Sequence, residues 1–239
     1  MSKSFLIDTT RCTACRGCQV ACKQWHGLPA EKTKNIGSYQ NPPDLSFDTY
    51  KLVRMKEEIV EGRLRWLFFP DQCRHCIEPP CRDVAGDPMA IFSDPATGAV
   101  LYTAATKELD AEEITASCPY NIPRASSGGV LAKCDMCIDR VQNGLDPACV
   151  KACPTGAMAF GERDEIMEKA KAHLATARKK HPRAQLLDPD DVRVIYLVAY
   201  DPLLYHSNAV ADAATFDINR QVALRRMMRP FTDFLSRLG

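Results

Sequence analysis

Residues 12–22 read Cys-Thr-Ala-Cys-Arg-Gly-Cys-Gln-Val-Ala-Cys, in which four cysteines follow the spacing Cys-x2-Cys-x2-Cys-x3-Cys. Three thiolates with this spacing can come from one loop that curls around a compact cluster and points backbone N–H groups at its sulfur atoms. In the bacterial two-cluster pattern, the fourth cysteine of such a run ligates a second [4Fe-4S] cluster. The run therefore predicts an iron–sulfur loop, although Lys23 stands where that pattern has a proline.

A second run, far along the chain, complements the first. Its four cysteines have a longer middle gap, and Pro154 follows the last of them. An exchange of fourth ligands between the two runs gives two sets of four thiolates. Site I then comprises Cys12, Cys15, Cys18 and Cys153. Site II comprises Cys22, Cys134, Cys137 and Cys149. This exchange would bring the two runs together around an inserted middle segment.

The middle segment repeats the pattern incompletely. It has three closely spaced cysteines, but Ala85 occupies the position where a fourth would fall. A separate cysteine, Cys118, is followed by Pro119 and looks like the surviving fourth ligand of a run that has lost its other three. Site III then comprises Cys73, Cys76, Cys81 and Cys118. The scheme uses all twelve cysteines and predicts three [4Fe-4S] clusters, whose iron these residues ligate.

Zinc and disulfides are the alternatives to iron–sulfur ligation. The second run alone could form a structural zinc site, because paired Cys-x2-Cys motifs bind zinc. A triple run such as that of residues 12–22 is unusual for zinc. A disulfide framework suits small secreted chains that lack a core, whereas this chain has 239 residues, of which 46% are hydrophobic.

The composition and the motifs that the chain lacks argue against several classes of function. Lys and Arg number 31 against 30 Asp and Glu, and the formal net charge of +1 argues against a nucleic-acid partner. No apolar run reaches the roughly 18 residues that a membrane span needs. Residues 1–8 show no secretory signal, which by itself favours the cytoplasm. The chain also lacks a nucleophile–base constellation and a dinucleotide fingerprint, so we expect no catalytic residues.

Short strands and helices are predicted between the cysteine motifs. Strands are expected over residues 4–8, 50–59, 63–69, 90–93, 99–102 and 192–199. Helices are expected over residues 17–25, 162–181, 219–229 and 231–238. This mixture indicates an α+β fold with two ferredoxin-like cluster-binding subdomains, the second inserted in the first, and a C-terminal helical extension. The predicted boundaries are residues 1–49 and 124–160 for the first subdomain, 50–123 for the second, and 161–239 for the extension.

With these motifs, the chain resembles the four-cluster ferredoxin-like electron-transfer subunits of molybdopterin oxidoreductases. The resemblance covers roughly residues 1–160 and rests on segments 11–18, 72–76, 118–120 and 133–137. A four-cluster subunit uses about sixteen cysteines, at about four per cluster, and this chain has twelve. The absence of the other four cysteines removes support for a fourth cluster, but it does not affect the ligand assignments for sites I, II and III.

Within that family, the chain is similar to beta subunits of soluble tungsten- or molybdenum-dependent formate dehydrogenases of sulfate-reducing bacteria, through residues 22–26, 37–45 and 66–70. The resemblance implies a non-catalytic subunit that relays electrons between a large molybdopterin (W or Mo) catalytic subunit and an external acceptor, for which a cytochrome is one candidate. It also implies export to the periplasm with the catalytic subunit, and no membrane span in the polar tail, residues 207–239. Two alternatives stay open: an electron-transfer subunit of a thiosulfate, polysulfide or sulfoxide reductase, and an independent soluble ferredoxin.

One histidine and several aromatic residues lie near the motifs. His75 is flanked by two predicted ligands, and we expect it to pack and hydrogen bond within the loop. Trp25, Trp66, Phe68 and Phe69 are expected to be buried, either around a cluster or at a partner interface.

Overall fold

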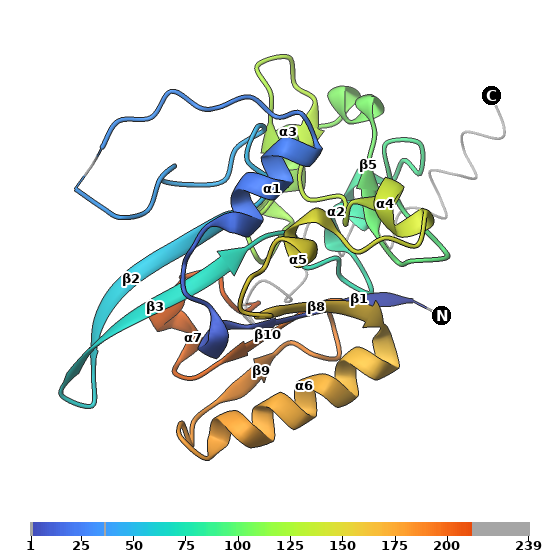
Figure 1. The fold of residues 1–239 in the computed structure, drawn as a ribbon. Helices are drawn as coiled ribbons and strands as arrows, with labels where there is room; N and C mark the ends of the chain where they lie inside the picture. Colours follow the sequence, from blue (N-terminus) through green and yellow to red (C-terminus); the bar gives the residue numbers. More distant parts are fainter. Residues whose placement is uncertain (1, 36, 212–239) are drawn as a thin grey trace, which may run out of the picture.

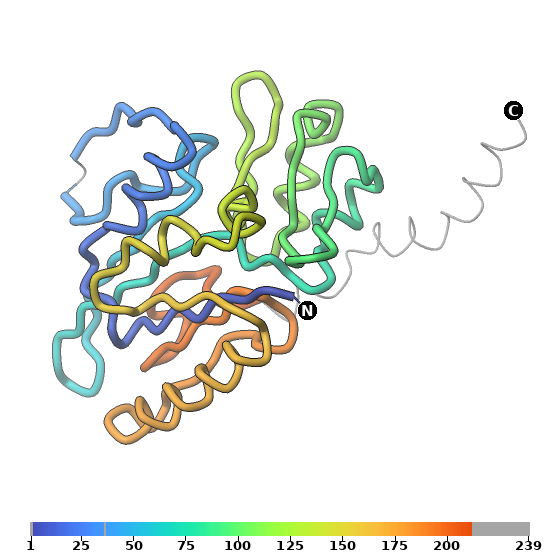
Figure 2. The backbone as a smooth tube through the Cα atoms, turned by 45° about the vertical axis from the view of Figure 1, so that its right-hand side comes forward, coloured from blue at the N-terminus to red at the C-terminus, as the bar shows by residue number. Residues whose placement is uncertain are grey.

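Strands from both ends of the described chain form the main sheet, in the order β8–β1–β10–β9 (Figure 1). The computed structural model describes residues 2–35 and 37–211. β1 (Lys3–Asp8) pairs antiparallel with β8 (Met158–Glu162) and parallel with β10 (Val194–Val198), and β10 pairs antiparallel with β9 (Gln185–Leu187). Figure 2 shows the N-terminal strand, in blue, beside orange segments from near the end of the described chain.

The main sheet is buried on both faces. Side chains alternate along a strand, so neighbouring residues of β1 and β10 face opposite ways. Leu6 and Ile195 pack in one cluster with residues of α6 (Arg163–Arg178). Phe5 and Tyr196 pack on the other face, in a cluster that includes cysteines of sites I and II. Figure 1 shows α6 below the sheet and the cysteine-bearing helices above it, so the sheet is the platform on which the cysteine loops rest.

Three hairpins complete the strands. The longest joins β2 (Leu52–Val60) to β3 (Arg63–Asp71) through Glu61 and Gly62, whose φ angles are 54° and 72°. Two consecutive left-handed residues are the signature of a tight turn whose twist matches that of the flanking strands. The shorter hairpins pair β4 (Ile91–Ser93) with β5 (Val100–Tyr102), and β6 (Arg124–Ala125) with β7 (Leu131–Ala132).

The remaining helices are short and lie among the cysteine motifs. The α-helices are α1 (Gly17–Trp25), α2 (Pro80–Ala85), α3 (Ala111–Ala116), α4 (Ile138–Gln142), α5 (Ala148–Lys151) and α7 (Pro202–Tyr205). Two 3-10 helices, η1 (Thr9–Arg11) and η2 (Ala104–Glu108), follow β1 and β5. Such short elements need support from the sheet and the loops around them, because short helices are marginal in water by themselves.

The α+β fold class is confirmed, and so are the predicted strands and helices that fall within the described residues. All six predicted strands are present, with ends within two residues of those expected. The helix over residues 17–25 is found with the expected bounds, and the long helix over 162–181 is found as α6. The predicted helices over residues 219–229 and 231–238 lie outside the described residues.

The sheet also bears on how the chain is divided. β9 and β10 lie within residues 161–239, the predicted extension, yet they belong to the same sheet as β1. This part of the extension is therefore integral to the platform under the cysteine loops, while the three-part division itself stays a prediction. Over residues 2–35 and 37–211, no helix combines the length and the apolar character that crossing a membrane would require.

Candidate iron–sulfur sites

Site III surrounds a small cavity between the middle hairpins. Cys73 and Cys76 follow β3, Cys81 lies in α2, and Cys118 follows α3. All four cysteines line the cavity, as the sequence pairing predicts for one ligand set. Burial, together with the neighbouring thiols of Cys81 and Cys73, raises the pKa of the Cys118 thiol to about 12. The unligated Cys118 thiol is therefore neutral at pH 7, and binding of iron would release its proton.

Other polar groups of the site III cavity fit an anionic cluster. Arg74 lines the cavity; its Nη1 donates to Asp71 Oδ1 at 2.6 Å, whereas its buried Nη2 has no hydrogen-bond partner in the described part of the chain. The backbone N–H of His75 donates to Cys73 Sγ at 3.3 Å. The sulfur atoms of a [4Fe-4S] cluster would accept hydrogen bonds from the Arg74 guanidinium and from backbone N–H groups such as that of His75. The residues that line the cavity therefore fit such a cluster.

Hydrogen bonds from neighbouring strands and from the segment next to β10 hold the site III loop in place. His75 is fully buried, and its Nδ1 accepts a hydrogen bond from the Val100 backbone N–H at 3.0 Å, which confirms its expected packing role. Arg193, next to β10, donates to the Cys76 carbonyl oxygen at 3.0 Å. Gly98, with a φ of +77°, leaves room for that guanidinium, because a β-carbon there would collide with it.

Site II joins the end of α1 to a later loop. Cys22 lies in α1, Cys134 and Cys137 lie in the turn between β7 and α4, and Cys149 lies in α5. All four are buried. Burial raises the pKa of the Cys137 thiol, and the nearby thiols of Cys149 and Cys22 contribute to the rise. The thiols of Cys22, Cys137 and Cys149 therefore lie near one another, as expected for members of one predicted set.

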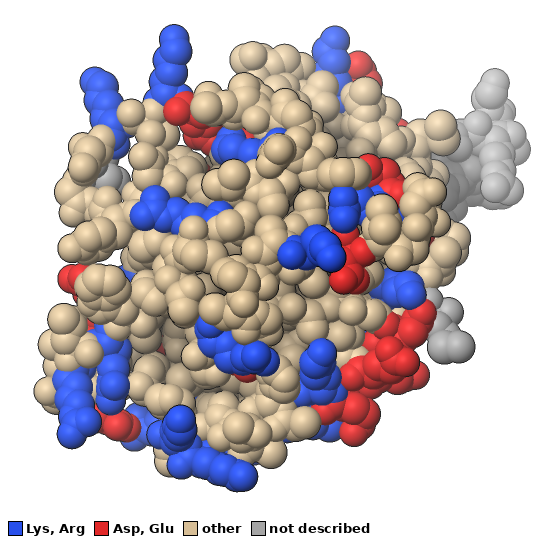
Figure 3. Space-filling model, viewed as in Figure 1, with Lys and Arg blue, Asp and Glu red and all other residues tan. Residues whose placement is uncertain are grey.

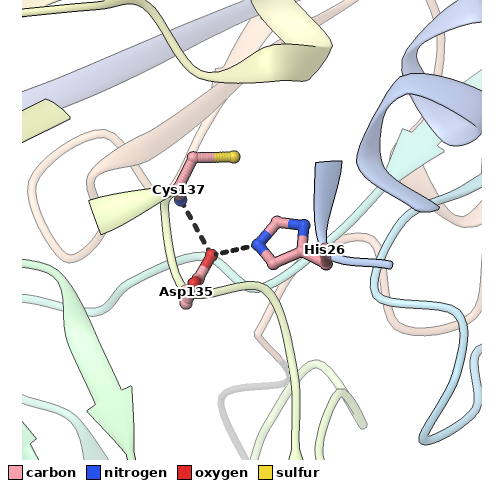
Figure 4. A group of neighbouring side chains, drawn as sticks. All are labelled: His26, Asp135 and Cys137. Carbon is pink, nitrogen blue, oxygen red and sulfur yellow. Dashed lines mark hydrogen bonds and ion pairs between the residues drawn. The ribbon is translucent and has the colours of Figure 1, made fainter. Parts of the chain in front are cut away.

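A histidine–aspartate pair supports the site II turn (Figure 4). His26 Nε2 lies 2.9 Å from Asp135 Oδ1, and the same oxygen accepts the Cys137 backbone N–H at 2.8 Å. His26 Nδ1 lies 3.8 Å from Cys22 Sγ. Burial lowers the pKa of His26, but the hydrogen bonds with Asp135 and Cys22 outweigh it and raise the pKa to about 11. Protonated His26 and ionised Asp135 therefore form an ion pair beside site II, and these two residues lie within ligand distance of Cys137 of that site.

Site I lies where α1 begins. Cys12 follows η1, Cys15 and Cys18 flank the start of α1, and Cys153 follows α5. Burial raises the pKa of the Cys12 thiol, and Cys153 and Cys15 are among the neighbouring thiols that add to the rise. Cys15 is exposed, so site I approaches the protein surface.

The three-cysteine loops share a backbone feature that the sequence did not indicate. Each contains non-glycine residues with left-handed φ angles: Ala14 (54°) and Arg16 (60°) in site I, Met136 (68°) and Cys137 (50°) in site II, and His75 (47°) in site III. Such residues curl the chain so that successive N–H groups converge on one point, which forms an anion-binding concavity. The loops are therefore shaped for a negatively charged group.

The three sites lie in a row with site II in the middle. Cys18 and Cys149 pack in one cluster of buried residues, which joins sites I and II. Cys73 and Cys134 pack in another, which joins sites II and III. Burial raises the pKa of Cys134 well above its ordinary value, and both Cys22 and Cys73 contribute. The contacts give the order I–II–III.

Apolar side chains occupy the space beyond site III. Cys81 packs there with Ala90, Ile91, Val100, Ile114 and Leu131 in a buried cluster, and Ala85 lies against it. Ala85, which occupies the position where a fourth cysteine of this run would fall, therefore contributes to apolar packing.

The aromatic residues near the motifs differ in burial. Phe69 is fully buried and stacks on Tyr196 with ring centroids 4.4 Å apart. Phe68 is partly buried, and Trp66 and Trp25 are 56% and 44% exposed, so burial within this chain is confirmed for Phe69 and is not found for the two tryptophans. Their place at a partner interface stays a prediction.

Charged side chains are mixed over the face in Figure 3. Basic residues are scattered, and acidic residues gather at the lower right, near the start of α6. Asp164 and Glu165 lie in the first turn of that helix, where negative charge is favourable. This face does not present the continuous basic surface that would attract a nucleic-acid backbone.

Comparison with known proteins adds a second line of support. The family model of the 4Fe-4S dicluster domain matches residues 64–163. The chain is 60% identical over 215 residues to formate dehydrogenase subunit beta of Megalodesulfovibrio gigas, with 88% of this chain and 100% of that protein covered. It is 54% identical over 216 residues to formate dehydrogenase 2 subunit beta (cytochrome c-553) of Nitratidesulfovibrio vulgaris, with 87% and 99% covered. It is 35% identical over 215 residues to the nitrate-inducible formate dehydrogenase iron–sulfur subunit of Escherichia coli K12, with 84% and 70% covered.

Proposed function

The chain belongs to the family of iron–sulfur beta subunits of formate dehydrogenases, and on that premise we propose that it relays electrons through three [4Fe-4S] clusters at sites I, II and III. The two ends of the relay would be a large molybdopterin catalytic subunit, containing tungsten or molybdenum, and an external electron acceptor. The clusters would supply one-electron redox chemistry, and the chain's own residues would hold, space and insulate them.

The observation that carries this proposal is that the four cysteines of site III line one cavity, as the sequence pairing predicts for one ligand set. Within each of the other two predicted sets, several thiols lie close enough to influence one another's pKa, which supports their pairing. The 4Fe-4S dicluster domain match covers the eight cysteines from Cys73 to Cys153, which are all four of site III, three of site II and one of site I. The run of residues 12–22 precedes the match and would supply the other three ligands of site I and the fourth ligand of site II.

The row of sites supports a linear relay. Cys18 and Cys149 bring sites I and II together, and Cys134 and Cys73 do so for sites II and III, so neighbouring clusters would be separated by little more than packed side chains. Sites I and III would be the two terminal stations. Ala85, which occupies the position where a fourth cysteine of the middle run would fall, supports three stations rather than four.

The partners and the location follow from the family. The printed names of the relatives assign them to formate dehydrogenases, and one of those names includes cytochrome c-553. Formate is therefore the proposed electron donor in the catalytic partner, and a c-type cytochrome is the proposed acceptor. The proposal includes a periplasmic complex, reached by export of this chain together with the catalytic subunit.

Copurification tests the proposal directly. The full-length chain, tagged and purified without oxygen from its native cells, should bring down a large subunit in one-to-one ratio, which peptide mass spectrometry identifies. Formate should then bleach the visible absorbance of the complex, because reduction of iron–sulfur clusters weakens it. A partner that acts on thiosulfate, polysulfide or a sulfoxide, or a chain that purifies alone, would contradict the proposal.

A further inference from the structure

Two lysines are buried among the cysteine sites. Lys51 and Lys133 are 2% and 6% exposed, and no other lysine in residues 2–35 and 37–211 is buried. Lys51 Nζ donates to Gln72 Oε1, and Lys133 Nζ donates to the carbonyl oxygens of Val100 (2.5 Å) and Cys134 (3.1 Å). All these acceptors are uncharged. Buried ammonium groups normally require a negative partner, yet neither lysine reaches a carboxylate in the described chain.

Lys51 lies at the junction of sites I and II. It directly precedes β2, whose first two residues, Leu52 and Val53, belong to buried clusters that contain cysteines of all three sites. Val53 packs in the cluster that contains Cys18 and Cys149, one cysteine from each of the two sites. Burial raises the pKa of the Cys149 thiol, and the Lys51 ammonium is the first influence that opposes the rise. No carboxylate in the described chain supplies the negative charge that Lys51 lacks, whereas clusters bound at these sites would supply it.

Lys133 occupies the corresponding place between sites II and III. It precedes Cys134 of site II and donates to the carbonyl oxygen of that residue. Its side chain lines the cavity of site III and lies over the Tyr102 ring, 4.6 Å from the centroid. Burial raises the pKa of the Cys81 thiol in site III, and the Lys133 ammonium opposes the rise. Each junction of the row thus contains one buried, unpaired cation.

We propose that Lys51 and Lys133 are fixed counter-charges that raise the reduction potentials of the clusters on either side of each junction. The proposal rests on the proposed function, because it requires clusters at sites I, II and III. An added electron increases the negative charge of a cluster, and a buried cation stabilises that state strongly where the dielectric constant is low. Adjacent clusters also repel one another's added electrons, and a cation between them offsets this repulsion. The lysines therefore act on potentials and do not exchange electrons themselves.

Substitution of each lysine by methionine tests this, because methionine keeps an unbranched, flexible side chain and removes the charge. The full-length protein, in the complex with which it purifies, is titrated potentiometrically without oxygen and followed by EPR. Lys51→Met should lower the potentials of two of three transitions, those of sites I and II. For each of these two transitions, the ratio of reduced to oxidised cluster at a fixed potential should fall at least tenfold. A tenfold fall corresponds to a shift of about 59 mV in the reduction potential of a one-electron couple. Lys133→Met should lower a different pair, those of sites II and III.

Comparison of Lys51→Met with Lys133→Met identifies the transition of site II. Its potential should fall in both variants, whereas the potentials of the site I and site III transitions should each fall in only one. Lys51→Arg is the matched control and should retain the original potentials. If Lys51→Met does not assemble, Gln72→Glu places a carboxylate against the intact lysine and should lower the potentials of the site I and site II transitions. Unchanged potentials in variants with full iron content would overturn the counter-charge role and leave the proposed function standing. Absence of three cluster transitions in the unmodified protein would overturn the proposed function itself.

Discussion

Asp71 is the most informative residue for testing what holds the cysteine loops in place. Its side chain is fully buried and accepts two ion pairs, from Arg54 Nε at 2.7 Å and from Arg74 Nη1 at 2.6 Å. Arg74 is itself almost fully buried and lines site III. Arg54 has a second partner in Asp44, at 2.6 Å, which is 48% exposed and also pairs with Arg124. Asp71→Asn therefore leaves Arg74 buried without a carboxylate, while Arg54 keeps one.

The magnitude follows from this difference in burial. Removing one partner of a buried ion pair costs about 3–5 kcal/mol, because the remaining charge is uncompensated. Arg74 incurs this cost on Asp71→Asn, whereas Asp44 limits the loss for Arg54. Asp44→Asn is the matched control with the same chemistry at a half-exposed position. It should cost about 0.2–1 kcal/mol, as exposed pairs do.

Anaerobic urea unfolding, followed by far-UV circular dichroism, measures the two effects. With a slope of about 2–3 kcal/mol per M for a chain of this size, Asp71→Asn should lower the midpoint by about 1–2 M. Asp44→Asn should lower it by less than about 0.5 M on the same scale. Equal midpoints for the two variants would refute the reasoning, since burial would then not decide the cost.

Three further predictions follow from particular residues. Burial lowers the pKa of His206 to about 4 from its ordinary 6.5. Between pH 6.5 and about pH 4, His206 is therefore protonated in the unfolded chain but neutral in the folded chain. Because the unfolded state binds more protons in this range, the free energy of unfolding falls as the pH falls. His206→Gln should make the free energy of unfolding depend less on pH over the same range. Gly98→Ala should lower the urea midpoint more than Gly62→Ala, because both have positive φ but only Gly98 faces the guanidinium that supports site III; equal losses would contradict that support. Cys118→Ser should abolish one EPR transition and Cys153→Ser a different one, and loss of the same transition in both would refute the pairing scheme.

Much of the candidate site could be predicted from the sequence because cluster ligation has a local signal. The spacing of residues 12–22 and the isolated Cys118 define the three sets, and the cavity around site III brings its four cysteines together as expected. The Glu61–Gly62 turn was equally readable, since two residues with positive φ are favoured in a tight hairpin.

The rest depends on long-range contacts that leave no local pattern. The parallel pairing of β1 with β10 joins residues from the two ends of the described chain, so residues 161–211 could not be recognised as part of the platform. Lys51 has no distinguishing neighbours in the sequence, and its burial depends on packing between β2 and two distant cysteine runs. The histidine–aspartate pair of His26 and Asp135 likewise becomes visible only once the runs are folded together.

The count of iron and acid-labile sulfide per chain tests the central claim most directly. Sites I, II and III together predict about twelve of each in the anaerobically purified protein, at about four per cluster. Cys118→Ser, which removes one ligand of site III, should lower both counts to about eight, with the other two sites intact. About sixteen in the unmodified protein, or zinc in place of iron at any of the three sites, would contradict the account.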